Sequence, residues 1–266
     1  MRRGAARAAA AVLLLAAGGC AGPPPAPALL DLERLERRHE ALLDARRARL
    51  RGTVAELSLW LETSARRWPG AHATYGIGGP DTLRLRVASS FGTALDLAAA
   101  ADSLWLWVPA ERAAVRAAAG EPPLSLPAAA AFAVRTAAAT WPVPATAWRA
   151  SRPADTLTVV RWIEAGDTLE LGVGSSGLPR RMRLVRSGMR PVRVTYLGYG
   201  PHEGTPWPER FEVEDEGGSL RLSVRVRRVW RAGAGDAERW RPQVPNEAEM
   251  LDPEVLWRRI AEEWTP

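Results

Sequence analysis

The feature that most constrains the fold is an alternation of apolar and polar residues with a period of two. In TVAELSLWLE, residues 53–62, every odd position from Ala55 to Leu61 is apolar, whereas Glu56 and Ser58 lie between them. The alternation returns in several further runs, at 82–89, 93–98, 103–108, 155–164, 167–173, 180–186, 191–199, 209–216 and 219–230. Successive side chains of a strand point to opposite faces, so each run predicts a half-buried strand.

Short connections join the first of these runs. Residues 78–81, 89–92 and 99–102 read GGPD, SSFG and AAAD, and loops of this length usually join antiparallel neighbours. We therefore expect a mainly β (α+β) fold, an antiparallel meander of about 10–11 strands whose sheet is polar on one face.

Three segments have helical character instead. Leucines recur at helical spacing among Glu and Arg over residues 29–50, which predicts an amphipathic helix. Serine and proline signals over 125–144 predict a helix of about three turns that crosses between two groups of strands. Leu251 and Leu256 have the spacing of a hydrophobic staple at the start of a short helix, residues 252–264.

The N-terminus has the order of an export signal: three arginines within the first seven residues, an apolar run at 8–17 and two glycines. The apolar run is shorter than the roughly 20 residues that a spanning helix needs. Cys20, the only cysteine, directly follows the glycines, where a bacterial lipoprotein is cut and lipidated. An ordinary secretory signal with a stray cysteine is the alternative, because Ala17 stands where such signals usually have Leu.

These signals predict the domain organisation. Residues 1–19 are the signal peptide, 20–28 are the lipidated Cys20 with a Pro-rich tether, and 29–266 form a single domain. Ala21 follows the cysteine, where an Asp would retain a lipoprotein in the inner membrane. We therefore expect a lipoprotein of the bacterial cell envelope, anchored by its N-terminal lipid in the outer membrane and facing the periplasm.

The charge argues against a nucleic-acid partner. Removing the three arginines of the signal from the 36 basic side chains leaves 33 against 30 acidic ones, a net of +3. The basic residues, all of them arginine, are scattered through the strands rather than clustered. With one cysteine the chain has no internal disulfide and no cysteine-based zinc site.

The sequence offers little for catalysis, metal binding or a cofactor. Gly172, Gly174 and Gly177 spell G-x-G-x-x-G, but a strand pattern follows where a dinucleotide site needs a helix, so we interpret the segment as a hairpin. The three histidines lack metal-ligand spacing. His202 with Glu203 is the first suspect for a hydrolase, yet a solvated loop pair is the better interpretation. We expect no enzyme, no cofactor and no metal.

Tryptophan is unusually frequent, with 12 against three Phe and three Tyr. Trp105 and Trp107 lie on one face of a strand, opposite Leu104 and Leu106, so both faces of this strand carry large apolar side chains. Packing under helices is the plainer explanation; an apolar cavity or contact with lipid headgroups is the other.

Four stretches carry a resemblance to a known family: 51–62, 81–116, 177–184 and 194–214, the last reading VTYLGYGPHEGTPWPERFEVE. Their order of hairpins, glycine and proline turns and tyrosine-bearing strands resembles the LolA/LolB lipoprotein-carrier superfamily over about residues 30–230. The resemblance implies a curved half-barrel whose concave apolar face is covered by helices and accommodates acyl chains.

The resemblance also implies candidate residues. The alternating apolar positions of the first strands would line the hydrophobic cavity or the core beneath it: Leu57, Leu59, Leu61, Leu83, Leu85, Val87, Leu95, Leu97, Leu104 and Leu106. In the membrane-anchored receptor of the family a protruding apolar residue helps to insert cargo, and the matching position here is Phe91, in a shorter loop.

The functional expectation is therefore a monomeric, membrane-anchored protein that binds lipid or lipoprotein acyl chains in a hydrophobic cavity. It could pass cargo received from a periplasmic carrier onward and so localise lipoproteins to the outer membrane. The alternative is a structural or interaction lipoprotein of the envelope whose sheet is filled by its own side chains.

Overall fold

A computed structural model describes residues 29–79, 82–90, 92–100, 103–118, 136–140, 148–149, 156–163, 167–185, 190–232, 244–252, 255–256 and 259. Cys20 and Phe91, and most of the helix predicted at 125–144, lie outside these ranges.

The described strands form one open sheet of 14 strands. They are β1 (Thr53–Thr63), β2 (Ala71–Gly79), β3 (Thr82–Ser89), β4 (Gly92–Ala100), β5 (Ser103–Val108), β6 (Ala113–Ala118), β7 (Trp148–Arg149), β8 (Thr156–Ile163), β9 (Asp167–Gly174), β10 (Pro179–Val185), β11 (Val192–His202), β12 (Thr205–Asp215), β13 (Leu220–Arg231) and β14 (Glu249–Leu251). A one-turn 3-10 helix, Pro109–Glu111, joins β5 to β6.

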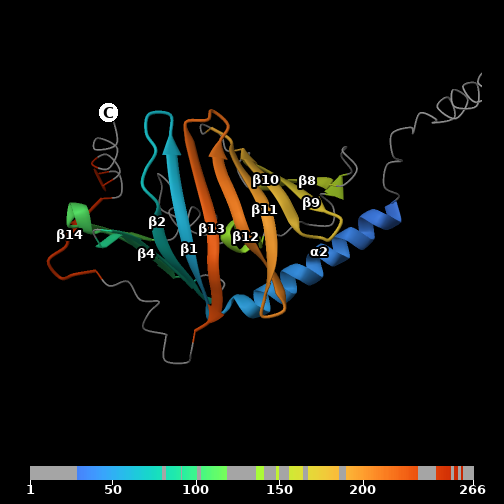
Figure 1. Ribbon diagram of the computed structural model, residues 1–266, viewed down its shortest axis with the longest axis horizontal. Coiled ribbons are helices and arrows are strands. Elements are labelled where there is room, and N and C mark those ends of the chain that lie inside the picture. Colours follow the sequence, from blue (N-terminus) through green and yellow to red (C-terminus); the bar gives the residue numbers. More distant parts are fainter. Residues whose placement is uncertain are drawn as a thin grey trace, which may run out of the picture.

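Two meanders meet in the middle of the sheet (Figure 1). The spatial order is β14-β6-β5-β4-β3-β2-β1-β13-β12-β11-β10-β9-β8-β7, so β1 through β6 run outward on one side and β13 back to β7 on the other. All neighbours pair antiparallel except β14, which pairs parallel to β6. The two edge strands do not pair with each other, and the sheet is a curved, incomplete barrel. The antiparallel meander predicted from the sequence is confirmed.

Four strands lie outside the ten alternating runs: β2, which has nine residues, and the shorter β6, β7 and β14. β6 reads AAVRAA, which has no strand alternation, but it pairs along its whole length with β5. The two edge strands β7 and β14 contain two and three residues. Their pairing depends on tertiary contacts, which explains why local patterning gives only about ten or eleven strands.

Helix α2 (Leu29–Leu50) matches the predicted helix and lies behind the sheet in Figure 1. Leu35 and Leu43 are buried on the helix face that packs on the sheet, and His39 and Arg46 are buried with them. We call the sheet face that contacts α2 the inner face and the opposite one the outer face. At the other end of the sheet, residues 255, 256 and 259 are helical, and Leu251 and Leu256 pack in one apolar cluster, as the predicted staple requires.

The G-x-G-x-x-G segment is a hairpin, as predicted. β9 ends at Gly174 and β10 begins at Pro179, and the Gly177 amide donates to the Gly174 carbonyl at 2.8 Å. Gly177 has a φ of +81°, and a Cβ there would approach the backbone of Arg38 and His39 in α2 at 3.2 Å. The glycine therefore serves the turn and the packing of α2, and no phosphate-binding helix follows it.

Candidate functional site

The inner face of the sheet gathers the predicted cavity residues. Strand registers align them in rows: Leu85 lies between Tyr75 and Leu97, and Leu97 lies opposite Leu106. Leu57 connects in the same way through Ala73 to Val87 and Leu95. Ten positions read from alternation alone therefore share one face across β1, β3, β4 and β5.

The ten residues differ in exposure. Four are buried: Leu57, Leu83, Leu104 and Leu106. The other six are only partly buried: Leu59, Leu61, Leu85, Val87, Leu95 and Leu97. The partly buried ones on β1 lie toward the strand end that leads into the β1–β2 connection. One end of the inner face is thus sealed, whereas the other keeps apolar surface that water reaches.

The exposed end continues across the seam between the two meanders. Leu61 lies opposite Leu222 of β13, which lies opposite Val213 of β12, and all three are partly buried. The next members of this row, Val194 and Met182, are fully buried. The apolar strip therefore grades from partly exposed on β1, β13 and β12 to sealed on β11 and β10.

Two apolar clusters fill the sealed parts. The larger joins Leu35 of α2 and Ala137–Ala139 to the inner faces of β1, β2 and β9–β13. The smaller joins β3, β5 and β6 to Leu256. Leu85 contacts both clusters, so it marks where they meet.

Two polar groups in the larger cluster have no hydrogen-bond partner among the described residues, the indole N–H of Trp207 and the hydroxyl of Tyr75. The Tyr75 hydroxyl is buried without a hydrogen-bond partner, and burial raises the pKa of Tyr75 well above its ordinary value. An unsatisfied buried hydroxyl costs about 1–3 kcal/mol. The inner face therefore includes a polar atom whose hydrogen bond the described side chains do not supply.

The polar residues of α2 fasten the helix to the sheet. The His39 Nδ1–H donates to the carbonyl of Gly177 at 2.8 Å. The Arg46 guanidinium donates to the Pro206 carbonyl through Nε at 3.2 Å and Nη2 at 2.8 Å, and through Nη1 to the carbonyls of Ala138 and Ala139. Arg46 thus joins α2, the short turn at 136–140 and β12 through one side chain.

Burial lowers the pKa of the Arg46 guanidinium, and the neighbouring Tyr199 and Tyr196 act in the opposite direction. The guanidinium still stays charged, because arginine does not deprotonate in proteins. His39 lies four residues from Leu35 and Arg46 three residues from Leu43, so helical spacing could have placed both on the buried face of α2. Their polarity suggests an exposed position instead. The backbone carbonyls that accept their hydrogen bonds cannot be predicted from the sequence.

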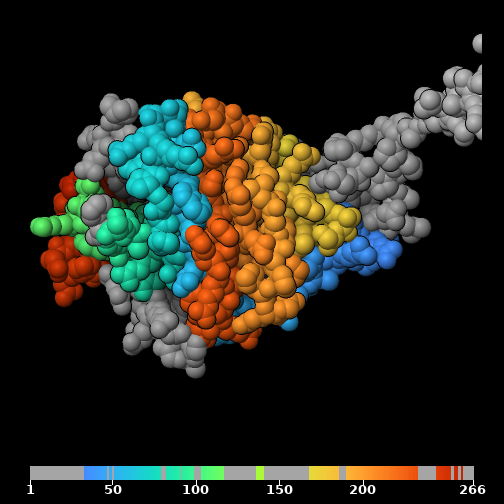
Figure 2. All heavy atoms as spheres, viewed as in Figure 1, coloured from blue at the N-terminus to red at the C-terminus, as the bar shows by residue number. Residues whose placement is uncertain are grey.

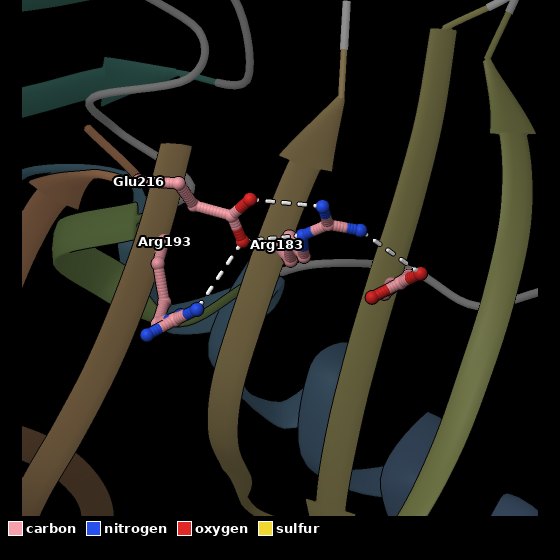
Figure 3. A network of polar contacts seen from close by, with 4 residues as sticks. Arg183, Arg193 and Glu216 are labelled. Atoms are coloured by element: carbon pink, nitrogen blue, oxygen red, sulfur yellow. Dashed lines mark hydrogen bonds and ion pairs between the residues drawn. The ribbon is translucent and has the colours of Figure 1, made fainter. Parts of the chain in front are cut away.

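The outer face is polar, and part of it is neutralised by ion pairs (Figure 3). Arg183 forms a bidentate pair with Glu216 at 2.5 and 2.9 Å, and also lies 3.4 Å from Glu170. Arg193 adds a second contact to Glu216 at 3.2 Å. The hydrogen bond from Arg183 is the main reason why the pKa of Glu216 lies below its ordinary value.

The described residues show no metal-binding cluster, since they contain no group of three His, Cys, Asp or Glu side chains that could hold a metal ion. His202 ends β11 and Glu203 occupies the following turn, and no hydrogen bond joins their side chains in the described part of the chain. Among the described helices, none is long and apolar enough to cross a membrane.

No family model matches this chain, and no curated protein is similar to it in sequence. Solved structures are similar in fold. A LolA superfamily protein of Nitrosomonas europaea matches with a TM-score of 0.52 and 10% identity, covering 77% of this chain and 97% of its own. A DUF1329 family protein of Desulfovibrio piger gives 0.54 and 9%, covering 77% and 95%.

A domain from Vibrio parahaemolyticus named for outer membrane lipoprotein sorting gives a TM-score of 0.52 at 9% identity, covering 77% of this chain and 96% of its own. At identities this low, the structural similarity establishes the fold and leaves the activity open. The open antiparallel sheet, the helix on its inner face and these three likenesses together show that this chain has a LolA/LolB-like fold.

Proposed function

We propose that this protein is a membrane-anchored lipoprotein of the bacterial envelope that binds lipid, or the acyl chains of lipoproteins, on the inner face of its sheet. The observation that carries the proposal is the graded apolar strip of the inner face, buried at Met182 and Val194 and partly exposed at Leu61, Leu222 and Val213. A surface of this kind stays in contact with water unless something apolar covers it.

Hydrocarbon burial supplies the energy for such binding. Sequestering a chain of about 15 methylenes at roughly 0.8 kcal/mol each gives a gross gain near 12 kcal/mol, before the cost of immobilising the chain. No covalent step and no specific polar residue is needed, so the proposed protein is a binder rather than an enzyme. The lipoprotein-sorting name of the Vibrio parahaemolyticus domain with this fold supports the same interpretation.

The location belongs to the same proposal. Lipidation of Cys20 would anchor the chain, and Ala21 favours the outer membrane, where the protein would face the periplasm and accept cargo from a soluble carrier. Transfer of lipoproteins toward that membrane is the specific role that we propose.

Lipid extraction tests the proposal directly. The mature polypeptide, residues 20–266 with Cys20→Ser, is purified from the bacterial envelope, and mass analysis of its organic extract should reveal co-purified acyl lipid. A fluorescent fatty acid should bind to the delipidated protein. Leu61→Glu should weaken this binding at least about tenfold, because it places a charge among partly exposed apolar neighbours.

Met250→Glu is the control. Met250 is 52% exposed on the edge strand β14, six strands away from β1 in the sheet, so adding the same charge there should leave fatty-acid binding unchanged. If the extract holds no lipid and neither variant alters probe binding, the inner face is not a binding surface.

A structural or interaction lipoprotein is the second candidate. The complete burial of Leu169, Leu171, Val173, Met182 and Val194 favours it, because their half of the inner face is already filled by the protein itself. Stoichiometric capture of one envelope protein without lipid uptake would support this role instead.

A further inference from the structure

The outer face has a groove of about 870 Å³ over β1 and β11–β13. Its lining includes four arginines, Arg67, Arg210, Arg225 and Arg227, and one carboxylate, Glu209. Figure 2 shows the side of the molecule where β13 lies between β1 and β12, in front of α2. The groove thus concentrates positive charge on one part of the outer face, although the basic residues are scattered along the sequence.

The neighbouring part of the same face is arranged differently. Around β9–β11, Arg183 and Arg193 point to Glu216, and Arg183 also approaches Glu170 (Figure 3). Arginine charge is neutralised there by carboxylates of the protein. Among the described residues, the arginines of the groove over β13 have little such neutralisation: Arg227 donates to the Ser58 hydroxyl, and Arg210 lies 3.7 Å from Glu212.

Arg225 shows the difference most clearly. It lies directly opposite Arg210 of β12 in the strand register, and opposite Ser58 of β1 on its other side. Among the described residues it has no carboxylate within ion-pair distance and no hydrogen bond, while Arg210 reaches Glu212 only at 3.7 Å. Like charges that face each other across two strands destabilise a sheet. An anion seated between them would remove this repulsion.

The apolar residues of the groove narrow the class of anion. Leu197, 48% exposed, and Trp60, partly buried, line the same groove as the arginines. Tryptophan and arginine together are typical of surfaces that meet lipid headgroups, where an anionic phosphate lies next to hydrocarbon. A fully hydrophilic anion would gain nothing from the leucine.

We propose that this groove binds the phosphate-bearing headgroups of anionic phospholipids, so that the outer face of β1 and β11–β13 is a membrane-contacting surface. The site is separate from the inner face, since the sheet lies between the two. It requires neither the lipid anchor nor an acyl-chain cavity.

Vesicle binding tests this site. The mature polypeptide, residues 20–266 with Cys20→Ser, has no acyl anchor and keeps every residue that the structure describes. It is titrated with phosphatidylcholine vesicles and with vesicles of phosphatidylcholine and phosphatidylglycerol that carry the same acyl chains. Because the acyl chains are identical, uptake on the inner face would affect both vesicles equally, and only the difference reports on headgroup charge.

We expect binding to the anionic vesicles alone, weakening as salt is added. Arg225→Glu should reduce this binding roughly tenfold, because each basic residue near an anionic surface contributes to binding and a charge reversal adds repulsion. The matched control is Arg34→Glu, an exposed arginine on α2 behind the sheet, which changes the net charge equally and should leave binding within about twofold.

Folding is checked on the same samples. Arg225→Glu replaces a like-charged pair by an opposite-charged one beside Arg210, so its melting temperature should not fall. Equal binding to both vesicle types, or equal losses in the Arg225 and Arg34 variants, would overturn the headgroup site. Tighter binding to a short DNA duplex than to anionic vesicles would also overturn it. None of these results bears on fatty-acid binding at the inner face.

Discussion

Arg46 places a permanent charge at a buried position where none of the described residues supplies a carboxylate to pair with it. Its side chain is 1% exposed, and its described partners are the carbonyls of Pro206, Ala138 and Ala139 together with the ring of Tyr199, whose centroid is 5.6 Å away. Carbonyl oxygens can solvate a guanidinium because its five donors spread over a plane. The side chain thus exchanges water for carbonyls of two backbone segments, β12 and the turn at 136–140, and joins both to α2.

Replacing Arg46 should therefore weaken the packing of α2, of the turn at 136–140 and of β12 together. We expect Arg46→Leu to lower the free energy of unfolding by about 3 kcal/mol, since it leaves buried carbonyls unpaired. Arg46→Lys should recover only part of this loss, because an ammonium can bond some of these carbonyls but cannot reach those of Pro206 and of the turn at 136–140 at once. Urea denaturation measures both, with Arg34→Leu, an exposed arginine of the same helix, expected within about 0.5 kcal/mol of the parent. A wild-type midpoint for Arg46→Leu would show that the carbonyls are satisfied otherwise.

Glu216 should make stability depend on pH. Its pKa in the folded protein lies below the ordinary value, chiefly because of the hydrogen bond from Arg183. A lowered folded pKa contributes stability that is present above the unfolded pKa and is lost as the pH falls through the folded pKa.

The test for Glu216 compares Glu216→Gln with the parent by urea denaturation. The variant should be less stable at pH 7, and the difference should shrink as the pH falls below the ordinary pKa of a glutamate and through the lowered pKa of the folded protein. In an Arg183→Met background, which removes the main hydrogen bond to Glu216, the same substitution should show a weaker dependence on pH. A difference that stays constant from pH 7 to pH 3 would mean that charge at Glu216 is irrelevant.

At the scale of elements, the β9–β10 hairpin and helix α2 depend on each other. Gly177 has a positive φ and lies against the helix backbone, and its carbonyl accepts the bond from His39. Arg38 adds a hydrogen bond from Nη1 to the carbonyl of Ser175 at 3.0 Å. The turn between β9 and β10 therefore holds α2 in place against the larger cluster.

Gly177→Ala, compared with a second glycine, should separate the cost of the backbone conformation from the cost of contact with α2. A left-handed φ costs an alanine about 1–2 kcal/mol, and the Cβ contacts at 3.2 Å with α2 add to it, so we expect a total loss of about 2–3 kcal/mol. Gly218→Ala is the control, because Gly218 has a φ of +68° with nothing within 4 Å of a Cβ and should lose only the backbone part. Equal losses in the two variants, measured by thermal unfolding, would show that the helix contact contributes nothing.

At the scale of the whole molecule, alternation predicted more than it could explain. It placed Leu57, Leu85 and Leu106 on one face, because strand parity is a local property of the chain. It could not show that β1 pairs with β13, which joins two meanders far apart in sequence, or that the alanines of β6 form a strand. It also could not divide the inner face into sealed and exposed parts, since burial depends on what packs over each residue.

Because the apolar core is divided into two clusters, we expect the two ends of the sheet to lose their packing independently. Leu256 is 1% exposed in the smaller cluster, which it shares with Leu104, Leu106 and Val115, while Leu85 is the contact to the larger one. Strands of an open sheet contact mainly their neighbours, so a loss of packing at one end should spread only a few strands inward. Leu256→Ala should cost about 3 kcal/mol locally.

Hydrogen exchange read strand by strand tests this division. In Leu256→Ala the amides of β5 and β6 should exchange much faster, whereas those of β10–β12 should keep the protection of the parent, because local opening draws on local contacts. Met182→Ala provides the reverse comparison, since Met182 is fully buried in the larger cluster. Loss of protection in both halves from either substitution would mean that contacts through Leu85 and the β1–β13 seam couple the sheet into one cooperative unit, and that a ligand entering the exposed end would be felt throughout it.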